Sequence, residues 1–153
     1  MYLALKFVHV LAVIAFVGNI SIGILWHTIG DSTRDPRIMA HTMKGILLAD
    51  KVFTIPGIIV LLIAGIATAL VGQLSILGTG WILWSIILFI ISGIAFGPVA
   101  RSQRQMLAVA QAAQTSGVMN WEDYNRFART WNIAGTIALL APLIAVLFMV
   151  TKP

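Results

Sequence analysis

The stretch LKFVHVLAVIAFVGN, at residues 5–19, is almost entirely apolar but carries a histidine at position 9. The apolar run continues to Trp26, and no charged residue follows Lys6 until Asp31. A helix needs about 20 mostly apolar residues to cross a bilayer, a length that residues 7–26 reach. We therefore predict a membrane-spanning helix with His9 near one end, and we expect this helix to be retained rather than cleaved as a signal peptide.

The composition of the whole chain indicates the same environment. Of its 153 residues, 59% are hydrophobic and only 10% are charged, whereas a soluble domain carries about 25% charged residues. Three more apolar runs, at residues 51–71, 81–100 and 131–150, are long enough to cross a bilayer. We predict an all-α, integral membrane four-helix transmembrane bundle that lies in the lipid bilayer and forms a single domain over residues 1–153.

The basic residues predict the orientation of this bundle. Arg34, Arg37 and Lys44 lie between the first two spans, and four arginines lie between the last two. Cytoplasmic connections of membrane proteins are enriched in Lys and Arg. We therefore predict a multi-pass protein of the bacterial inner (cytoplasmic) membrane with both termini outside. Since the net charge of +5 arises between the apolar runs, we attribute it to orientation and expect no nucleic-acid partner.

Capping patterns predict that the helices continue beyond the spans. Asp35 followed by Pro36 is typical of a helix start, so the second helix is expected to run from about residue 36 to 71. The third helix is expected to continue past its span and to end at Gly117, and the fourth to begin at Asn120.

Small residues predict where helices approach one another closely. Gly93 and Gly97 form a G-x-x-x-G pattern, and the last span carries a stripe of alanines at positions 134, 138, 141 and 145. Such residues let helix backbones pack tightly in membranes. We expect packing within the bundle, with a homodimer contact as the alternative.

Asp50 is the only acidic residue at the edge of the second span. A carboxylate has a short stem and cannot easily reach out to water, so we expect it to be buried beside a basic partner, Arg101 or Arg129. The alternative is a proton or ligand site.

Two histidines lie on one face of the first helix. His9 and His27 are 18 residues apart, which is about five turns and roughly 27 Å of helix. We expect their shared face to turn toward the bundle. An ionisable residue inside a span indicates a functional site, the alternative being a simple hydrogen bond to a neighbouring helix or to water.

The chain lacks the residues that several kinds of site require. It has no cysteine, which excludes disulfides, thiolate metal sites, iron–sulfur clusters and a c-type haem. No serine-hydrolase, zinc-protease or P-loop pattern is present. Axial ligation of a b-type haem remains as a use for a lone histidine in a helix bundle. His9 and His27 are too far apart to share one iron, and we take His9 as the ligand.

Several short motifs resemble those of a bacterial family of small four-helix integral membrane proteins. They are LKFVHV with Gly18, then LLADKVFTIPG, a tryptophan opening the third span, and the ending MVTKP. The resemblance covers essentially the whole chain. This family is distantly similar to the membrane-bound protoporphyrinogen oxidase of bacteria and to copper-resistance D membrane proteins.

The resemblance implies a four-helix core and, from the oxidase, binding of haem b. It implies that His9, His27 and Lys51 are the cofactor-binding residues, because they fall at positions comparable to those of the oxidase. The chain departs from the common pattern at Phe16, where a tryptophan is usual, and at Asn19, where a second glycine is usual.

Three functions are compatible with these residues. We favour a b-type haem protein that works in electron transfer or haem handling, alone or with a membrane redox partner. The alternatives are a non-enzymatic accessory or assembly protein of the membrane, and a metal permease similar to the copper-resistance proteins.

Overall fold

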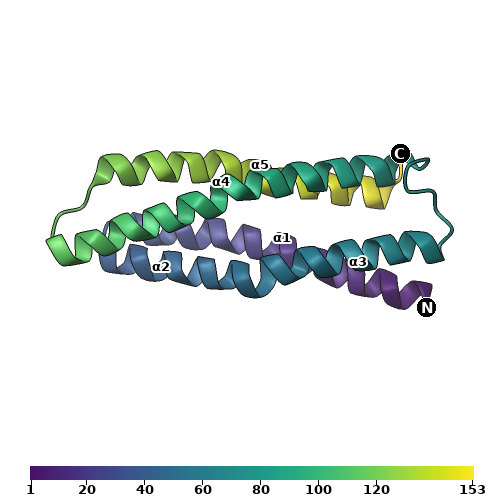
Figure 1. Ribbon diagram of the computed structural model, residues 1–153, viewed down its shortest axis with the longest axis horizontal. Coiled ribbons are helices and arrows are strands. Elements are labelled where there is room, and N and C mark those ends of the chain that lie inside the picture. The colour runs from purple at the N-terminus through teal and green to yellow at the C-terminus, as the bar shows by residue number, and fades with distance from the viewer.

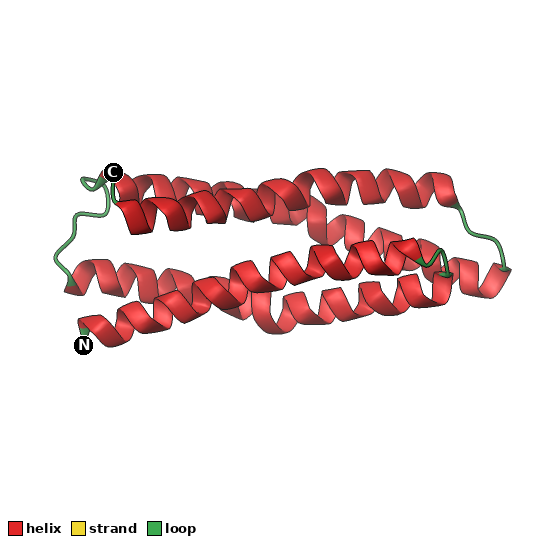
Figure 2. Ribbon diagram, turned by 180° about the vertical axis from the view of Figure 1, so that it is seen from behind, coloured by secondary structure: helices red, strands yellow, loops and turns green.

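The computed structural model describes residues 1–153 and consists of helices joined by short loops, with no strand (Figure 2). Each of its four long helices is long and apolar enough to cross a membrane. The elements are α1 (Tyr2–Ser32), α2 (Pro36–Ala49), the π-helical segment η1 (Asp50–Thr54), α3 (Ile55–Val71), α4 (Gly80–Ser116) and α5 (Trp121–Thr151). The predicted all-α four-helix bundle is confirmed.

Both chain termini lie at one end of the bundle, together with the loop between α3 and α4 (Figure 1). We call this the terminal end. The connections from α1 to α2 and from α4 to α5 lie at the opposite end, which we call the distal end. These two connections contain the basic clusters on which the predicted orientation rests.

The predicted helix boundaries are confirmed by local geometry. The Asp35 carboxylate accepts a hydrogen bond from the Arg37 backbone N–H at 2.8 Å, and the Asn120 side-chain oxygen accepts one from the Asp123 N–H at 3.1 Å. Each oxygen satisfies a backbone donor that the first turn of a helix leaves free. Gly117 ends α4 with φ of 74°, a left-handed conformation that glycine adopts without steric cost.

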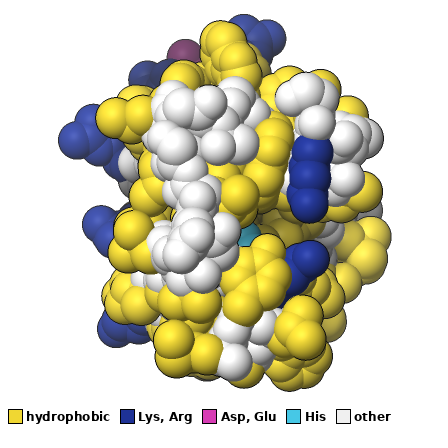
Figure 3. Space-filling view, turned by 90° about the vertical axis from the view of Figure 1, so that its right-hand side faces the viewer, with side chains coloured by type: hydrophobic (Ala, Val, Ile, Leu, Met, Phe, Trp, Pro, Cys, Tyr) yellow, Lys and Arg dark blue, Asp and Glu magenta, His cyan; other side chains and the backbone are white.

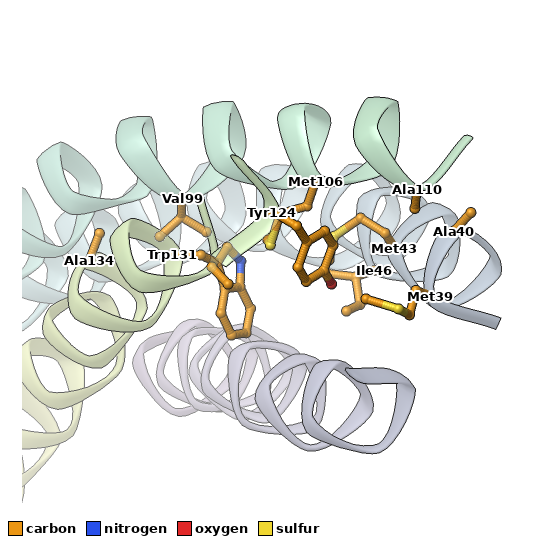
Figure 4. Close-up of a cluster of buried hydrophobic side chains, with 11 residues drawn as sticks. Met39, Ala40, Met43, Ile46, Val99, Met106, Ala110, Tyr124, Trp131 and Ala134 are labelled. Carbon is orange, nitrogen blue, oxygen red and sulfur yellow. The ribbon is translucent and has the colours of Figure 1, made fainter. Parts of the chain in front are cut away.

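The main hydrophobic core lies toward the distal end (Figure 4). There α2, α4 and α5 extend beyond the apolar runs, and α1 packs beside them. Water next to these extensions provides a hydrophobic driving force that lipid does not. The core side chains are Met39, Ala40, Met43, Ile46, Val99, Met106, Ala110, Tyr124, Ala128, Trp131 and Ala134.

Toward the terminal end the helices form two pairs, α1 with α3 and α4 with α5 (Figure 1). No Cα atom of α3 lies within 8 Å of a Cα atom of α4 or α5. The rings of Phe16 and Phe89 connect the pairs, with centroids 5.7 Å apart. The two pairs are therefore joined through few groups in this half of the bundle.

Alanines and serines hold α4 against α5. Ser92 donates a hydrogen bond to the Ala138 carbonyl at 2.8 Å, and Ser85 donates one to the Ala145 carbonyl at 3.2 Å. Ala134, Ala138 and Ala141 are buried, so the predicted alanine stripe packs within the bundle.

The prediction for Gly93 and Gly97 is wrong as far as it concerns packing within the chain. Both glycines are exposed, and a Cβ atom built on either would meet no other atom within 4 Å. The spacing of two glycines marks a smooth helix face, but it does not say whether protein or lipid covers that face.

The segment η1 changes which neighbours the second long helix meets. Before it, α2 packs against α4 and α1, whereas after it α3 packs against α1 alone among the other long helices. A π-helical turn holds more residues than an α-helical turn, so it rotates the faces of the helix that follows relative to the helix that precedes.

Candidate functional site

The His9 side chain is fixed between α1 and α3. Its Nδ1 atom lies 3.0 Å from the backbone carbonyl oxygen of Leu61. A carbonyl oxygen can only accept a hydrogen bond, so Nδ1 is the donor in this contact. Nε2 is then the ring nitrogen that remains for a further partner.

Gly65 provides the space that this ring occupies. A Cβ atom at position 65 would lie 2.9 Å from Cε1 of His9 and 3.0 Å from Nδ1, but 3.9 Å from Nε2. Gly65 therefore lies closer to the Cε1–Nδ1 edge of the imidazole than to Nε2.

The terminal end of the molecule is hollowed at its centre. Figure 3 shows this end in space-filling form, with a small part of a histidine side chain visible between hydrophobic side chains, Lys or Arg side chains and other groups.

His27 lies in different surroundings, in the core near the distal end. It is only 4% exposed, and its ring stacks on Trp131 with centroids 4.3 Å apart. Its Nε2 atom lies 3.4 Å from the sulfur of Met106 and 3.8 Å from a carboxylate oxygen of Asp31. The ring is enclosed by side chains from α4 and α5 and by its own helix.

The structure does not bring the three predicted cofactor-binding residues together. His9 faces α3 in the terminal half, and His27 lies in the distal core. Lys51 is exposed within η1 and forms no ion pair. The three residues therefore do not form one common site.

Asp50 is buried, as predicted, but the predicted basic partner is wrong. Its carboxylate accepts hydrogen bonds from the Asn19 amide at 3.0 Å, the Thr54 hydroxyl at 2.8 Å and the Gln103 amide at 2.9 Å. Arg101 and Arg129 are exposed and form no ion pair; long basic side chains can extend to a polar surface while their backbone stays in the bundle.

Asn19, Thr54 and Gln103 were missed as members of this polar cluster. Thr54 follows Asp50 by four residues, a spacing that places two helical side chains next to each other. Asn19 stands out in the sequence only because a second glycine is usual at that position in the family. Gln103 has no sequence signal, since only the fold brings its side chain from α4 to Asp50.

A cavity of about 20 Å³ lies beside the polar cluster, and Asn19, Asp50, Gln103 and Trp131 are among its lining residues. The Oε1 atom of Gln103 and the Nε1 atom of Trp131 are buried and have no hydrogen-bond partner in the protein. A space of this size holds one water molecule, which can donate to the first atom and accept from the second.

No three His, Asp or Glu side chains lie close enough to hold a metal ion together.

A model of one protein family matches residues 3–153 of the chain, and its description is "Predicted integral membrane protein (DUF2269)". Neither a curated protein nor a solved structure matches the chain.

Proposed function

The chain belongs to the DUF2269 family of predicted integral membrane proteins, and on that premise we propose that it binds one b-type haem through His9. Its role would be electron transfer or haem handling in the bacterial inner membrane. When bound, haem supplies one-electron chemistry or a coordination position for small ligands.

The observation that carries this proposal is the hydrogen bond from His9 Nδ1 to the Leu61 carbonyl, 3.0 Å long. Histidines that ligate a metal usually donate their other ring N–H to a carbonyl or carboxylate, which fixes the tautomer and the ring orientation. In this protein α3 supplies that carbonyl, and the ring is held so that Nε2 is free to bind iron.

The arrangement of helices supports a site between the two pairs. In the terminal half no Cα atom of α3 lies within 8 Å of a Cα atom of α4 or α5, and the Phe16–Phe89 pair connects α1 to α4. Phe16 lies seven residues after His9, which is roughly 10 Å along the helix. These rings would border the site toward the distal end of the bundle.

His27 and Lys51 are less suited to the iron. The Nε2 atom of His27 already contacts Met106 and its ring is stacked on Trp131, so ligation there would disrupt the core. Lys51 lies ten residues before Leu61, which is roughly 15 Å along the helix. The proposal therefore rests on His9 alone among the three predicted residues.

The test is the visible absorption spectrum of the protein purified from membranes, compared among three variants. His9→Ala should abolish the Soret band, whereas His41→Ala, a change on the exposed face of α2, should leave it intact. His27→Ala should lower thermal stability and retain haem in the folded fraction.

A Soret band that survives His9→Ala but disappears with His27→Ala would place the haem in the distal half and refute the proposal. A colourless, well-folded parent protein that also fails to bind added haem would refute it as well. In that case the accessory or assembly role would remain, with His9 acting as a hydrogen-bonding residue between α1 and α3.

A further inference from the structure

An open groove of about 580 Å³ lies between α4 and α5. It is separate from His9 and from the Asp50 cluster, and five of its eight lining residues are polar or charged. Its lining residues are Gly97, Pro98, Arg101, Ser102, Gln105, Arg126, Phe127 and Thr130.

The polar groups on the α4 side of the groove are not used within the protein. Arg101 forms no ion pair, and neither Ser102 nor Gln105 forms a side-chain hydrogen bond. Ser102 is nevertheless only 2% exposed, and it lines the groove.

The α5 side of the groove adds a second guanidinium. Arg126 forms an ion pair with Asp123 at 2.7 Å through one of its terminal nitrogens. Since a guanidinium carries five N–H donors, Arg126 keeps donors for a further acceptor. Two guanidinium groups with hydroxyl and amide donors between them are suited to a phosphate group.

The groove lies where the apolar part of α4 ends. Arg101 is the first charged residue after the uncharged run 81–100, and Thr130 directly precedes the apolar run of α5. Gly93 and Gly97 precede Arg101 within this apolar run, and they leave a smooth, exposed face on α4. A ligand at this level would have its polar part beside the arginines and its apolar part along the glycine face.

We propose that this groove binds the phosphate headgroup of an anionic phospholipid, with Arg101 and Ser102 as the principal contacts. Basic pockets between membrane helices are suited to anionic headgroups, and the glycine face above the groove provides room for an acyl chain. A soluble phosphate compound would use the same donors but would gain nothing from that apolar face.

Native mass spectrometry of the full-length protein in detergent tests the proposal. Phosphatidylglycerol, phosphatidylcholine and inorganic phosphate are added separately at equal concentrations. The parent protein should retain phosphatidylglycerol in preference to phosphatidylcholine, and Arg101→Gln should lower that retention by about fivefold or more, because a charge-assisted contact is lost. Ser102→Ala should lower it by a smaller factor.

Arg104→Gln is the matched control, since Arg104 is also exposed, lies on the same helix and does not line the groove. Equal losses in Arg101→Gln and Arg104→Gln would indicate diffuse charge attraction and overturn the proposal. Retention of inorganic phosphate, a lack of preference for phosphatidylglycerol, or a lipid-free dimer as the main species would overturn it too. These results are independent of haem content, so they leave the proposed function untouched.

Discussion

The imidazole of His27 stacks on the indole of Trp131, with ring centroids 4.3 Å apart and ring planes 19° apart. This contact joins α1 to α5 through the centre of the bundle. On the same indole, the Nε1 atom has no protein partner, and the residue lines the small cavity next to Asp50. Trp131 thus belongs both to the hydrophobic core and to the boundary of the polar cluster.

Trp131→Ala should destabilise the protein strongly. Replacing a buried tryptophan with alanine costs about 3–5 kcal/mol in well-packed cores, and Trp131 is only 4% exposed. Thermal unfolding in detergent measures the effect. Trp84→Ala is the matched control, because Trp84 is 57% exposed and its loss should change the melting temperature little; equal effects of the two changes would contradict the packing described for Trp131.

Asp50→Ala and Asp50→Asn should differ in their effect on stability. Alanine leaves the Gln103 amide and the Thr54 hydroxyl without their acceptor, at a cost of about 1–3 kcal/mol for each group that stays buried and unpaired. The Asn19 amide keeps its hydrogen bond to the Thr54 oxygen. Asparagine keeps one acceptor oxygen, and the Gln103 amide can rotate to accept a bond from the new amide group.

We therefore expect a clear fall in melting temperature for Asp50→Ala and a smaller one for Asp50→Asn. If both variants are equally destabilised, the hydrogen bonds that asparagine can keep are not what stabilises the cluster, which would contradict this account.

Gly65→Ala should destabilise the α1–α3 pair through His9. The added methyl group would lie 2.9 Å from Cε1 of His9 and would displace the ring from the Leu61 carbonyl. Gly93→Ala is the matched control, since it meets no atom within 4 Å and should stabilise the helix by about 0.5–1 kcal/mol. In a His9→Ala background the effect of Gly65→Ala should shrink, which a double-mutant cycle measures.

The predicted orientation can be tested with single cysteines, since the chain has none of its own. Ser75→Cys lies in the loop at the terminal end and Thr115→Cys near the end of α4 at the distal end. A membrane-impermeant thiol reagent added to intact cells should label position 75 and not position 115. The reverse pattern would place both termini in the cytoplasm.

The sequence predicted the elements of this fold better than their contacts. Length and apolarity define a membrane span. Asp35, Asn120 and Gly117 cap the ends of the helices that they adjoin, so both the spans and the helix ends could be located from the sequence alone. The partners of Asp50 come from α1, η1 and α4, and their meeting depends on how the helices pack. The π-helical turn at Asp50 likewise has no spacing signal, since the same residues would be read as a continuous helix.

The site predictions divide in the same way. The histidine pair could be placed on one helix face by counting residues. The Leu61 carbonyl, which fixes the tautomer of His9, is a backbone group and carries no residue signature. Gly93 and Gly97 show the converse, because a recognisable pattern there does not correspond to a contact within the chain.

The position of the hydrophobic core has a consequence for how the terminal half assembles. The core fastens α1, α2, α4 and α5 near the distal end, so the two helix pairs meet in the terminal half as tethered neighbours rather than as separate molecules. Short tethers of this kind give effective concentrations in the millimolar range. Contacts as weak as the one between Phe16 and Phe89 can then keep the pairs together. The pairs can also separate and close again at the terminal end as a local event, without unfolding of the core.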